Sequence, residues 1–357
     1  MNKYIRKDLE NFRPYHAPLK PYEIKVDANE NPFPHHEALK EAIGQWTKEK
    51  DNFTRYPDTD AHALRAKISE HYNVSKDNVM CGVGSDQVIE CIIKVFIEPL
   101  DKVVMPTPTF SMYKLSTIVN HGQVIEVPLD DEFEYDLDLF IRTIKEEQPK
   151  LVFLCTPNNP TGCILNKEQI VEVIKACNCP IVVDEAYAEF TGISVVDMID
   201  EYDNLIVVRT FSKSYGLAGL RTGYAIANKE MIDTLNVTKP PYNLSSFSQM
   251  ASLFVLKHHS FYMEQVELLK KQRAYLAEQL KTLNFVEKVY NSGTNFLLIR
   301  VSDYTIVNLL EANKILVRDY PPTGDLANCI RITIGTEKEN QKLLQILYKF
   351  GSTSNGK

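Results

Sequence analysis

A series of continuous apolar runs between residues 78 and 213 constrains the fold more than any other feature of the sequence. Most of the runs end in polar residues, glycines or prolines, and amphipathic stretches separate the runs. The runs are NVMCGVGS (78–85), DKVVMPTPTF (101–110), QVIEVPL (123–129), PKLVFLCTPNNPTG (149–162), PIVVDEAYAEF (180–190) and NLIVVRTFSK (204–213). Apolar strands that alternate with helices are typical of a mainly parallel sheet covered on both faces. We therefore predict an α/β fold.

The polar residues that end these runs predict where a ligand would bind. Ligands of such sheets bind at the carboxyl ends of the strands. Side chains that are far apart in the sequence should therefore meet in one crevice, namely Ser85, Phe110, Asn159, Asp184, Tyr187, Ser212 and Lys213. Ser85 is also the expected N-cap of a helix over residues 86–97.

The remainder of the chain predicts a second, smaller domain and an arm. Two long amphipathic stretches over roughly 228–283 precede short β-rich pieces and two further helices, which is typical of an α+β domain. Prolines 14, 18, 21, 32 and 34 predict an extended segment before the sheet. We expect an N-terminal arm over 1–35 that joins the small domain or a dimer contact. A large domain over 36–245 and a small domain over 246–357 should follow.

Composition narrows the class of protein. The chain of 357 residues is 44% hydrophobic and 24% charged, with a formal net charge of −7, which disfavours broad electrostatic binding to nucleic acid. The sequence has neither a membrane-length apolar stretch nor a signal-peptide pattern, so we expect a cytoplasmic protein. Its seven cysteines predict no disulfide framework. Neither Cys177-x-Cys179 nor the pairs His35-His36 and His258-His259, which we expect on the surface, predict a metal site.

The stretch TFSKSYGLAGLRTGYA (210–225) places Lys213 and Arg221 in a loop of small residues after a buried strand. A lysine in a partly desolvated cleft loses proton affinity, which favours imine formation with an aldehyde. Asp184 could pair with a protonated ring nitrogen, and Tyr187 could bond a ring hydroxyl. Arg221 and a helix N-terminus suit a phosphate. Each residue alone could be a solvated, loop or core residue; together they predict a pocket for a phosphorylated pyridine aldehyde.

Three motifs carry a resemblance to a known family. TPNNPTG (156–162), VVDEAY (182–187) and TFSKSYGLAGLRTGY (210–224) resemble the signatures of fold-type I aminotransferases that depend on pyridoxal 5'-phosphate (PLP). The chain resembles the histidinol-phosphate aminotransferase branch most, through DANENP (27–32), RYPD (55–58), GVGSDQVIE (82–90), TPTFSMY (107–113) and CIRITIGT (329–336) among others. The resemblance covers nearly the whole chain in the expected order.

The resemblance implies a role for each matching residue. Lys213 would bind the cofactor's aldehyde and later move a proton, while Asp184 would pair with the ring nitrogen. Asn159 and Tyr187 would contact the ring hydroxyl oxygen, and Phe110 would stack on the ring. The phosphate would be held by the Ser85 and Asp86 amides, Ser212, Arg221 and, from a second subunit, Tyr56, which implies a homodimer.

The resemblance also implies the substrates. Histidinol phosphate and the glutamate/2-oxoglutarate pair would exchange an amino group in histidine biosynthesis. Arg331 would bind the donor's carboxylate, and Tyr15, Asn29 and Arg318 would complete the substrate site, with Arg318 facing the substrate's phosphate. Two residues depart from the branch's pattern: Asp27 replaces a frequent asparagine and Phe110 a frequent tyrosine.

Other functions stay open at this point. A threonine-phosphate decarboxylase resembles the same branch and differs in which bond at the substrate's Cα is broken. A broad or aromatic amino acid transaminase could use the same pocket. A PLP-binding transcription regulator would need a DNA-binding domain ahead of DANENP, where about 25 proline-rich residues stand. A nucleotide-binding protein lacks support, because the sequence contains no G-x-G-x-x-G or Walker loop.

Overall fold

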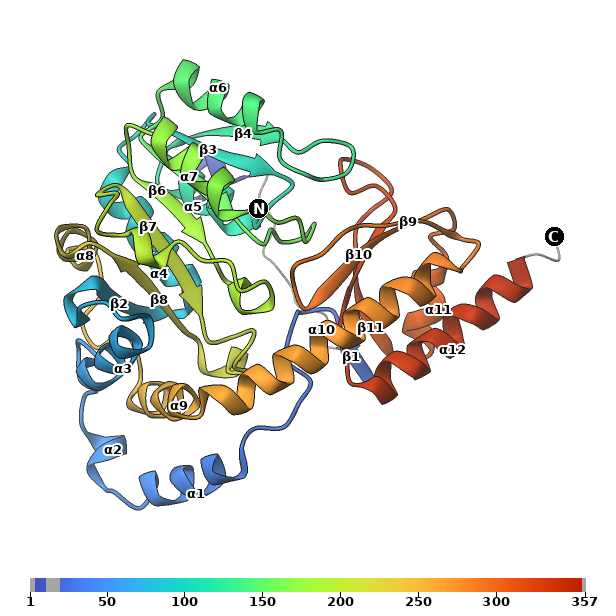
Figure 1. Ribbon diagram of the computed structural model, residues 1–357, viewed down its shortest axis with the longest axis horizontal. Coiled ribbons are helices and arrows are strands. Elements are labelled where there is room, and N and C mark those ends of the chain that lie inside the picture. Colours follow the sequence, from blue (N-terminus) through green and yellow to red (C-terminus); the bar gives the residue numbers. More distant parts are fainter. Residues whose placement is uncertain (1–3, 11–19, 355–357) are drawn as a thin grey trace.

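The structure, a computed structural model, describes residues 4–10 and 20–354. It consists of two lobes, each built on its own sheet (Figure 1). The larger lobe holds a seven-stranded sheet in the order β2-β8-β7-β6-β5-β3-β4, and the smaller one a five-stranded sheet in the order β1-β11-β12-β10-β9. The prediction of an α/β fold is confirmed.

The seven-stranded sheet is parallel except for one strand. Its strands are β2 (Val79–Val83), β3 (Lys102–Thr107), β4 (Gln123–Pro128), β5 (Leu151–Cys155), β6 (Ile181–Asp184), β7 (Leu205–Thr210) and β8 (Thr222–Ala227). Only β8 runs antiparallel, against both β2 and β7. The apolar runs in the sequence therefore correspond to the parallel strands, whose carboxyl ends lie at one edge of the sheet.

Both faces of this sheet are covered by helices, which explains why its strands are apolar throughout. On one face Val152, Leu154 and Val207 pack against α3 (His62–Tyr72), α6 (Leu137–Glu147), α7 (Lys167–Ala176) and α9 (Ser246–Lys257). On the other face Phe153 and Val208 pack against α4 (Gly84–Phe96), α5 (Ser111–Val119) and α8 (Lys229–Asn236). Successive strand residues point to opposite faces, so neither face can be polar.

The small lobe combines one strand from the N-terminal part of the chain with the C-terminal part. Its strands are β1 (Ile24–Val26), β9 (Val286–Val289), β10 (Phe296–Val301), β11 (Ile315–Asp319) and β12 (Cys329–Thr333), with helices α10 (His259–Lys281), α11 (Ile306–Ala312) and α12 (Glu337–Ser354). Strand β1 comes from the expected arm and pairs in parallel with β11 at the edge of this sheet. The peripheral helices α1 (Glu37–Trp46) and α2 (Asp51–Thr54) then lead into the large lobe (Figure 1).

The long stretch over 228–283 forms three helices, α8, α9 and α10, rather than two. Helix α9 packs on the large sheet, whereas most of α10 packs on the small one. The histidine pairs at this junction are half-buried, which differs from the surface position that we expected. Ring centroids of His36 and His258 lie 4.7 Å apart, and those of His71 and His259 lie 4.5 Å apart. Within the described residues, no helix combines the length and apolar character needed to span a bilayer.

Candidate active site

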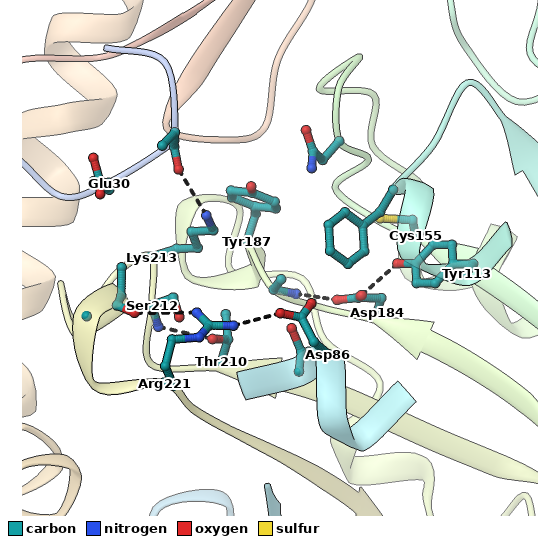
Figure 2. A pocket seen from close by; sticks show the side chains of 17 residues that line it. Glu30, Asp86, Tyr113, Cys155, Asp184, Tyr187, Thr210, Ser212, Lys213 and Arg221 are labelled. Carbon is teal, nitrogen blue, oxygen red and sulfur yellow. Dashed lines mark hydrogen bonds and ion pairs between the residues drawn. The ribbon is translucent and has the colours of Figure 1, made fainter. Parts of the chain in front are cut away.

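A cavity of about 380 Å³ lies at the carboxyl ends of the parallel strands (Figure 2). This volume suits a small organic ligand. The cavity is lined by nine of the residues that the sequence predicts to converge or to bind a cofactor: Ser85, Asp86, Phe110, Asn159, Asp184, Tyr187, Ser212, Lys213 and Arg221. The predicted convergence of distant segments is therefore confirmed as geometry.

Lys213 points into the cavity from the loop that follows β7. Its Nζ donates to the Ala28 carbonyl oxygen at 3.3 Å and lies 5.7 Å from the centre of the Tyr187 ring. Burial and, to a smaller extent, the positive charge of Arg331 together lower the pKa of Lys213 to about 8. Near neutral pH a larger fraction of this amine is neutral than of an ordinary lysine, and only a neutral amine can attack a carbonyl carbon.

Asp184 ends β6 and is 3% exposed. Its carboxylate accepts hydrogen bonds from the Tyr113 hydroxyl at 2.6 Å and from the Ala186 amide at 3.0 Å. Burial raises the pKa of Asp184 to about 6, although the Tyr113 bond acts in the opposite direction. A buried carboxylate is stabilised most by a hydrogen bond from a cationic N–H group. The part of the cavity beside Asp184 therefore fits a protonated ring nitrogen.

Tyr113 is a lining residue that the sequence analysis missed. It is fully buried on α5, stacks on Phe153 with 4.4 Å between ring centroids, and lies edge-on to Phe110 at 5.6 Å. The signal was present in TPTFSMY, because residues three apart on a helix share one face. The other missed lining residues are mostly small: Ala28, Glu30, Cys155, Ala186, Thr210, Ala218 and Gly219.

The N-terminus of α4, Ser212 and Arg221 surround one end of the cavity (Figure 2). The expected N-cap role of Ser85 is wrong, because the helix already begins at Gly84 and its N-cap residue is Val83. The side-chain oxygen of Gln87 accepts a hydrogen bond from the Val83 amide at 2.9 Å. Ser85 thus lies inside the first turn and lines the cavity, where helix amides favour an anion.

Two glycines allow the close approach of backbone at this end. A Cβ on Gly84, whose φ is +70°, would lie 2.5 Å from Arg221 Nη2. A Cβ on Gly223 would lie 2.3 Å from the Ser85 amide nitrogen. Arg221 Nη2 itself bonds the Asp86 carboxylate at 2.7 Å, with both side chains partly exposed. This end of the cavity, formed by the first turn of α4 and by Arg221, therefore combines helix amides with a guanidinium. We call it the cradle; its donors suit a phosphate.

Of the predicted substrate residues, Asn29 and Arg331 contact lining residues directly. Asn29 is buried, and its Nδ2 donates to the Tyr187 hydroxyl at 2.8 Å. Arg331 lies on β12, and its Nη1 donates to Asn159 Oδ1 at 2.5 Å. Because β12 belongs to the small lobe and Asn159 follows β5, this bond connects the two lobes at the cavity.

Two predicted residues, Arg318 and Tyr56, are not among the residues that line the cavity. Arg318 on β11 is paired in register with Arg331, and its guanidinium lies 5.8 Å from the Tyr320 ring. Tyr56 is 80% exposed, stacks on Tyr242, and does not line this cavity within the described part of the chain. Tyr15 lies outside the described residues.

The chain is similar to known aminotransferases along its length. It matches the family described as aminotransferase class I and II over residues 22–347. It is 41% identical over 352 residues to a histidinol-phosphate aminotransferase of Ruminiclostridium cellulolyticum, covering 98% of both chains. The corresponding protein of Thermoanaerobacter pseudethanolicus is 40% identical over 342 residues, covering 95% of this chain and 96% of that one. The solved structure of histidinol-phosphate aminotransferase from Clostridium acetobutylicum has a TM-score of 0.84 at 27% identity, covering 92% of this chain and 99% of the other.

Proposed function

The chain belongs to the aminotransferase class I and II family, and we propose that within it the protein is a PLP-dependent histidinol-phosphate:2-oxoglutarate transaminase. The observation that carries this proposal is that Lys213 and Asp184 line one cavity, at one end of which helix amides and a guanidinium suit a phosphate. The full-length similarity to enzymes named histidinol-phosphate aminotransferase supports the choice of substrate.

Pyridoxal phosphate supplies, when bound, an aldehyde that accepts amino groups and an electron-poor ring that stabilises negative charge at a substrate's Cα. Lys213 would hold the aldehyde end, and as a free amine its Nζ would take a proton from the substrate's Cα and deliver it to the carbon of the cofactor's aldehyde group. Asp184 would hold the proton of the ring nitrogen. The α4 amides, Ser212 and Arg221 would bind the phosphate, and Phe110 would cover one face of the ring.

Arg331 and Arg318 are proposed to bind the acidic groups of the substrates. They lie opposite each other on adjacent strands, so their two positive charges favour a dianionic molecule beside them. Arg331 Nε is buried and has no hydrogen-bond partner among the described residues, which leaves a donor for a carboxylate. Arg318 would then take the phosphate of histidinol phosphate, with Asn29 and Tyr15 completing the site.

We also propose that the protein acts as a homodimer in the cytoplasm. Phe53 is 66% exposed and Tyr56 80% exposed on the same short segment, and an aromatic surface of this kind favours burial against a second copy. Tyr56 would then reach the partner's phosphate cradle. All seven cysteines are free thiols, as suits a reducing compartment. Sedimentation equilibrium should give twice the chain mass; a monomer would refute the dimer.

The experiment that tests the proposed function follows the absorbance of the PLP-loaded protein. Addition of histidinol phosphate without a keto acid should convert the aldehyde-type band to an amine-type band, and 2-oxoglutarate should restore it. Glutamate should produce the same conversion, because it is the donor of the second half-reaction. No conversion by histidinol phosphate, together with release of carbon dioxide from threonine phosphate, would refute the transaminase and indicate the decarboxylase.

A further inference from the structure

A buried ionic cluster lies on the face of the large sheet opposite Asp184. Arg209 on β7 is 5% exposed, and its Nε and Nη2 donate to Glu185 Oε2 at 3.0 and 2.6 Å. Its Nη1 donates to Glu189 Oε1 at 3.0 Å and to the Tyr72 hydroxyl at 2.9 Å. One guanidinium therefore makes bonds to three other side chains, all of which are buried or partly buried.

The partners of Arg209 alternate along the chain with residues that line the cavity. Glu185 directly follows Asp184, and Glu189 comes two residues after Tyr187. Arg209 itself directly precedes the lining residue Thr210, in the strand that leads to Lys213. Successive residues of a strand point to opposite faces, so Arg209 and Glu185 lie behind the cavity wall that Thr210 and Asp184 form.

The cluster also reaches the next strand and a helix. The Tyr72 hydroxyl is 2.9 Å from that of Tyr224 on β8, and Tyr72 is the last residue of α3. Glu185 Oε1 accepts a hydrogen bond from the Val195 amide at 2.7 Å, and this bond connects the start of the loop after β6 to a residue ten positions later. Arg209 thus connects the segment that carries Asp184 and Tyr187 to the strand that delivers Lys213.

Stability alone does not explain such a cluster. Removing charges from water is costly, and well-packed apolar residues in their place often give equal or greater stability. What the ionic cluster adds is direction, because a guanidinium bonded at several nitrogens fixes the orientation of each partner. Chemistry between groups on two loops depends on such placement, since a misplacement of about 1 Å can slow a reaction about 100-fold.

We propose that Arg209 is a positioning residue that fixes the loop of Asp184 and Tyr187 relative to Lys213. Arg209 acts through Glu185 and Glu189 and touches neither substrate nor cofactor. The inference rests on the proposed function, because Lys213 and Asp184 must act on one bound molecule for their relative placement to matter.

The first test needs no cofactor and compares Arg209→Met with the wild type. The rate at which an amine-reactive acetylating reagent labels Lys213 is measured against pH by mass spectrometry on the cofactor-free full-length protein. Loosening the loop should admit water to Lys213, so the midpoint of labelling should shift to higher pH. Val173→Ala is the matched control, because Val173 is buried on α7 in the same lobe and its loss should lower the melting temperature without moving the midpoint.

The second test uses the PLP-loaded proteins in a transamination assay. Arg209→Met should lower kcat about 100-fold, while KM for the amino donor changes by less than about threefold. Arg209→Lys keeps a positive charge in the cluster but loses the several nitrogens of the guanidinium, so it should fold even if Arg209→Met does not. It should shift the labelling midpoint and kcat in the same directions as Arg209→Met.

The results separate this inference from the proposed function. The positioning role would be overturned if both Arg209 variants kept the labelling midpoint and the kcat of the wild type. It would also be overturned if Val173→Ala changed the midpoint and kcat as much as the Arg209 variants do. If the wild-type protein transfers no amino group from any donor, the proposed function fails, whereas the labelling midpoints still decide whether Arg209 holds Lys213 in place.

Discussion

At the scale of single residues, two opposite shifts of pKa define the cavity. Burial lowers the pKa of Lys213 to about 8 and raises that of Asp184 to about 6. Both shifts have the same cause, because a low-dielectric surrounding disfavours the charged form of each group. Lys213 therefore becomes available as a nucleophile and a base near neutral pH, whereas hydrogen bonds from Tyr113 and Ala186 help Asp184 to keep its charge.

Tyr113→Phe tests this support of Asp184. The Tyr113 hydroxyl lowers the carboxyl's pKa, so its removal should raise that pKa and protonate more of Asp184 at a given pH. The acid limb of the kcat profile should move to higher pH, with a loss of stability of about 1.5–3 kcal/mol for the charge-assisted bond. Tyr135→Phe is the matched control, because Tyr135 donates to the Cys155 carbonyl instead. A profile that moves equally in both variants would contradict the account.

Lys213→Met tests the burial of the amine through stability. Unfolded Lys213 titrates at about 10.5 and the folded residue at about 8, so between these values the unfolded chain binds the extra proton and stability rises with pH. Cofactor-free wild type should therefore be less stable than Lys213→Met below pH 8, by up to roughly 3 kcal/mol. The difference should shrink as pH rises to 10.5. Urea unfolding across this range measures it, and a difference independent of pH would be the contrary result.

At the scale of elements, the turn between β2 and α4 depends on glycines that the backbone itself requires. A Cβ on Gly223 would meet the backbone of Gly84 and Ser85, neither of which can swing aside as a side chain can. Gly84 lies in the left-handed region, and a Cβ there would meet Arg221. The site proposed for the phosphate is therefore formed by two adjacent strands and one helix, and not by Arg221 alone.

Gly223→Ala should accordingly weaken both the fold and the cradle. Forcing atoms into a packed position costs about 1–3 kcal/mol, and the displaced α4 amides should raise the dissociation constant for PLP. Gly44→Ala is the control, because nothing lies within 4 Å of that position in helix α1. The control should gain up to about 1 kcal/mol from helix propensity. Urea unfolding and PLP titration report both effects; unchanged PLP affinity in Gly223→Ala would contradict the role of the cradle.

Periodicity made the strands predictable, but not the details at their ends. Buried parallel strands leave a continuous apolar signal, so the ends of β5, β6 and β7 could be located in the sequence. The start of α4 could not, because the Gln87 side chain satisfies the Val83 amide and the helix begins before Ser85. Tyr113 could have been found from its spacing to Phe110, but its bond to the distant Asp184 could not. Arg209 was missed because its partners are distant in sequence, and no local pattern records such bonds.

At the scale of the whole molecule, the cavity depends on both lobes. Lys213 and Asp184 come from the large sheet, whereas Arg331 reaches Asn159 from the small one. The paired positions of Arg318 and Arg331 at adjacent strands could not be read from a sequence in which they stand far from the motif of Lys213. Their assignment to substrates rests on the resemblance, and the structure adds their common location on one sheet.

Arg318→Met should separate the two half-reactions. Losing a charge-assisted bond worth about 1.5–3 kcal/mol should raise KM for histidinol phosphate about 10- to 100-fold and leave the glutamate half-reaction nearly unchanged. Arg142→Met, on the exposed surface of α6, is the control for the loss of one positive charge. Stopped-flow absorbance of each half-reaction gives the constants. Equal damage to both halves would show that Arg318 does not face the substrate's phosphate.

The proposed function requires that Lys213 carries the cofactor in this cavity. Borohydride reduction of the PLP-loaded protein, followed by peptide mass spectrometry, tests it most directly. We expect one modified peptide in the wild type, with the pyridoxyl phosphate mass on Lys213. Lys213→Ala should show no modified peptide, although it should still bind PLP without a covalent bond. Modification of another lysine, or none in the wild type, would contradict it.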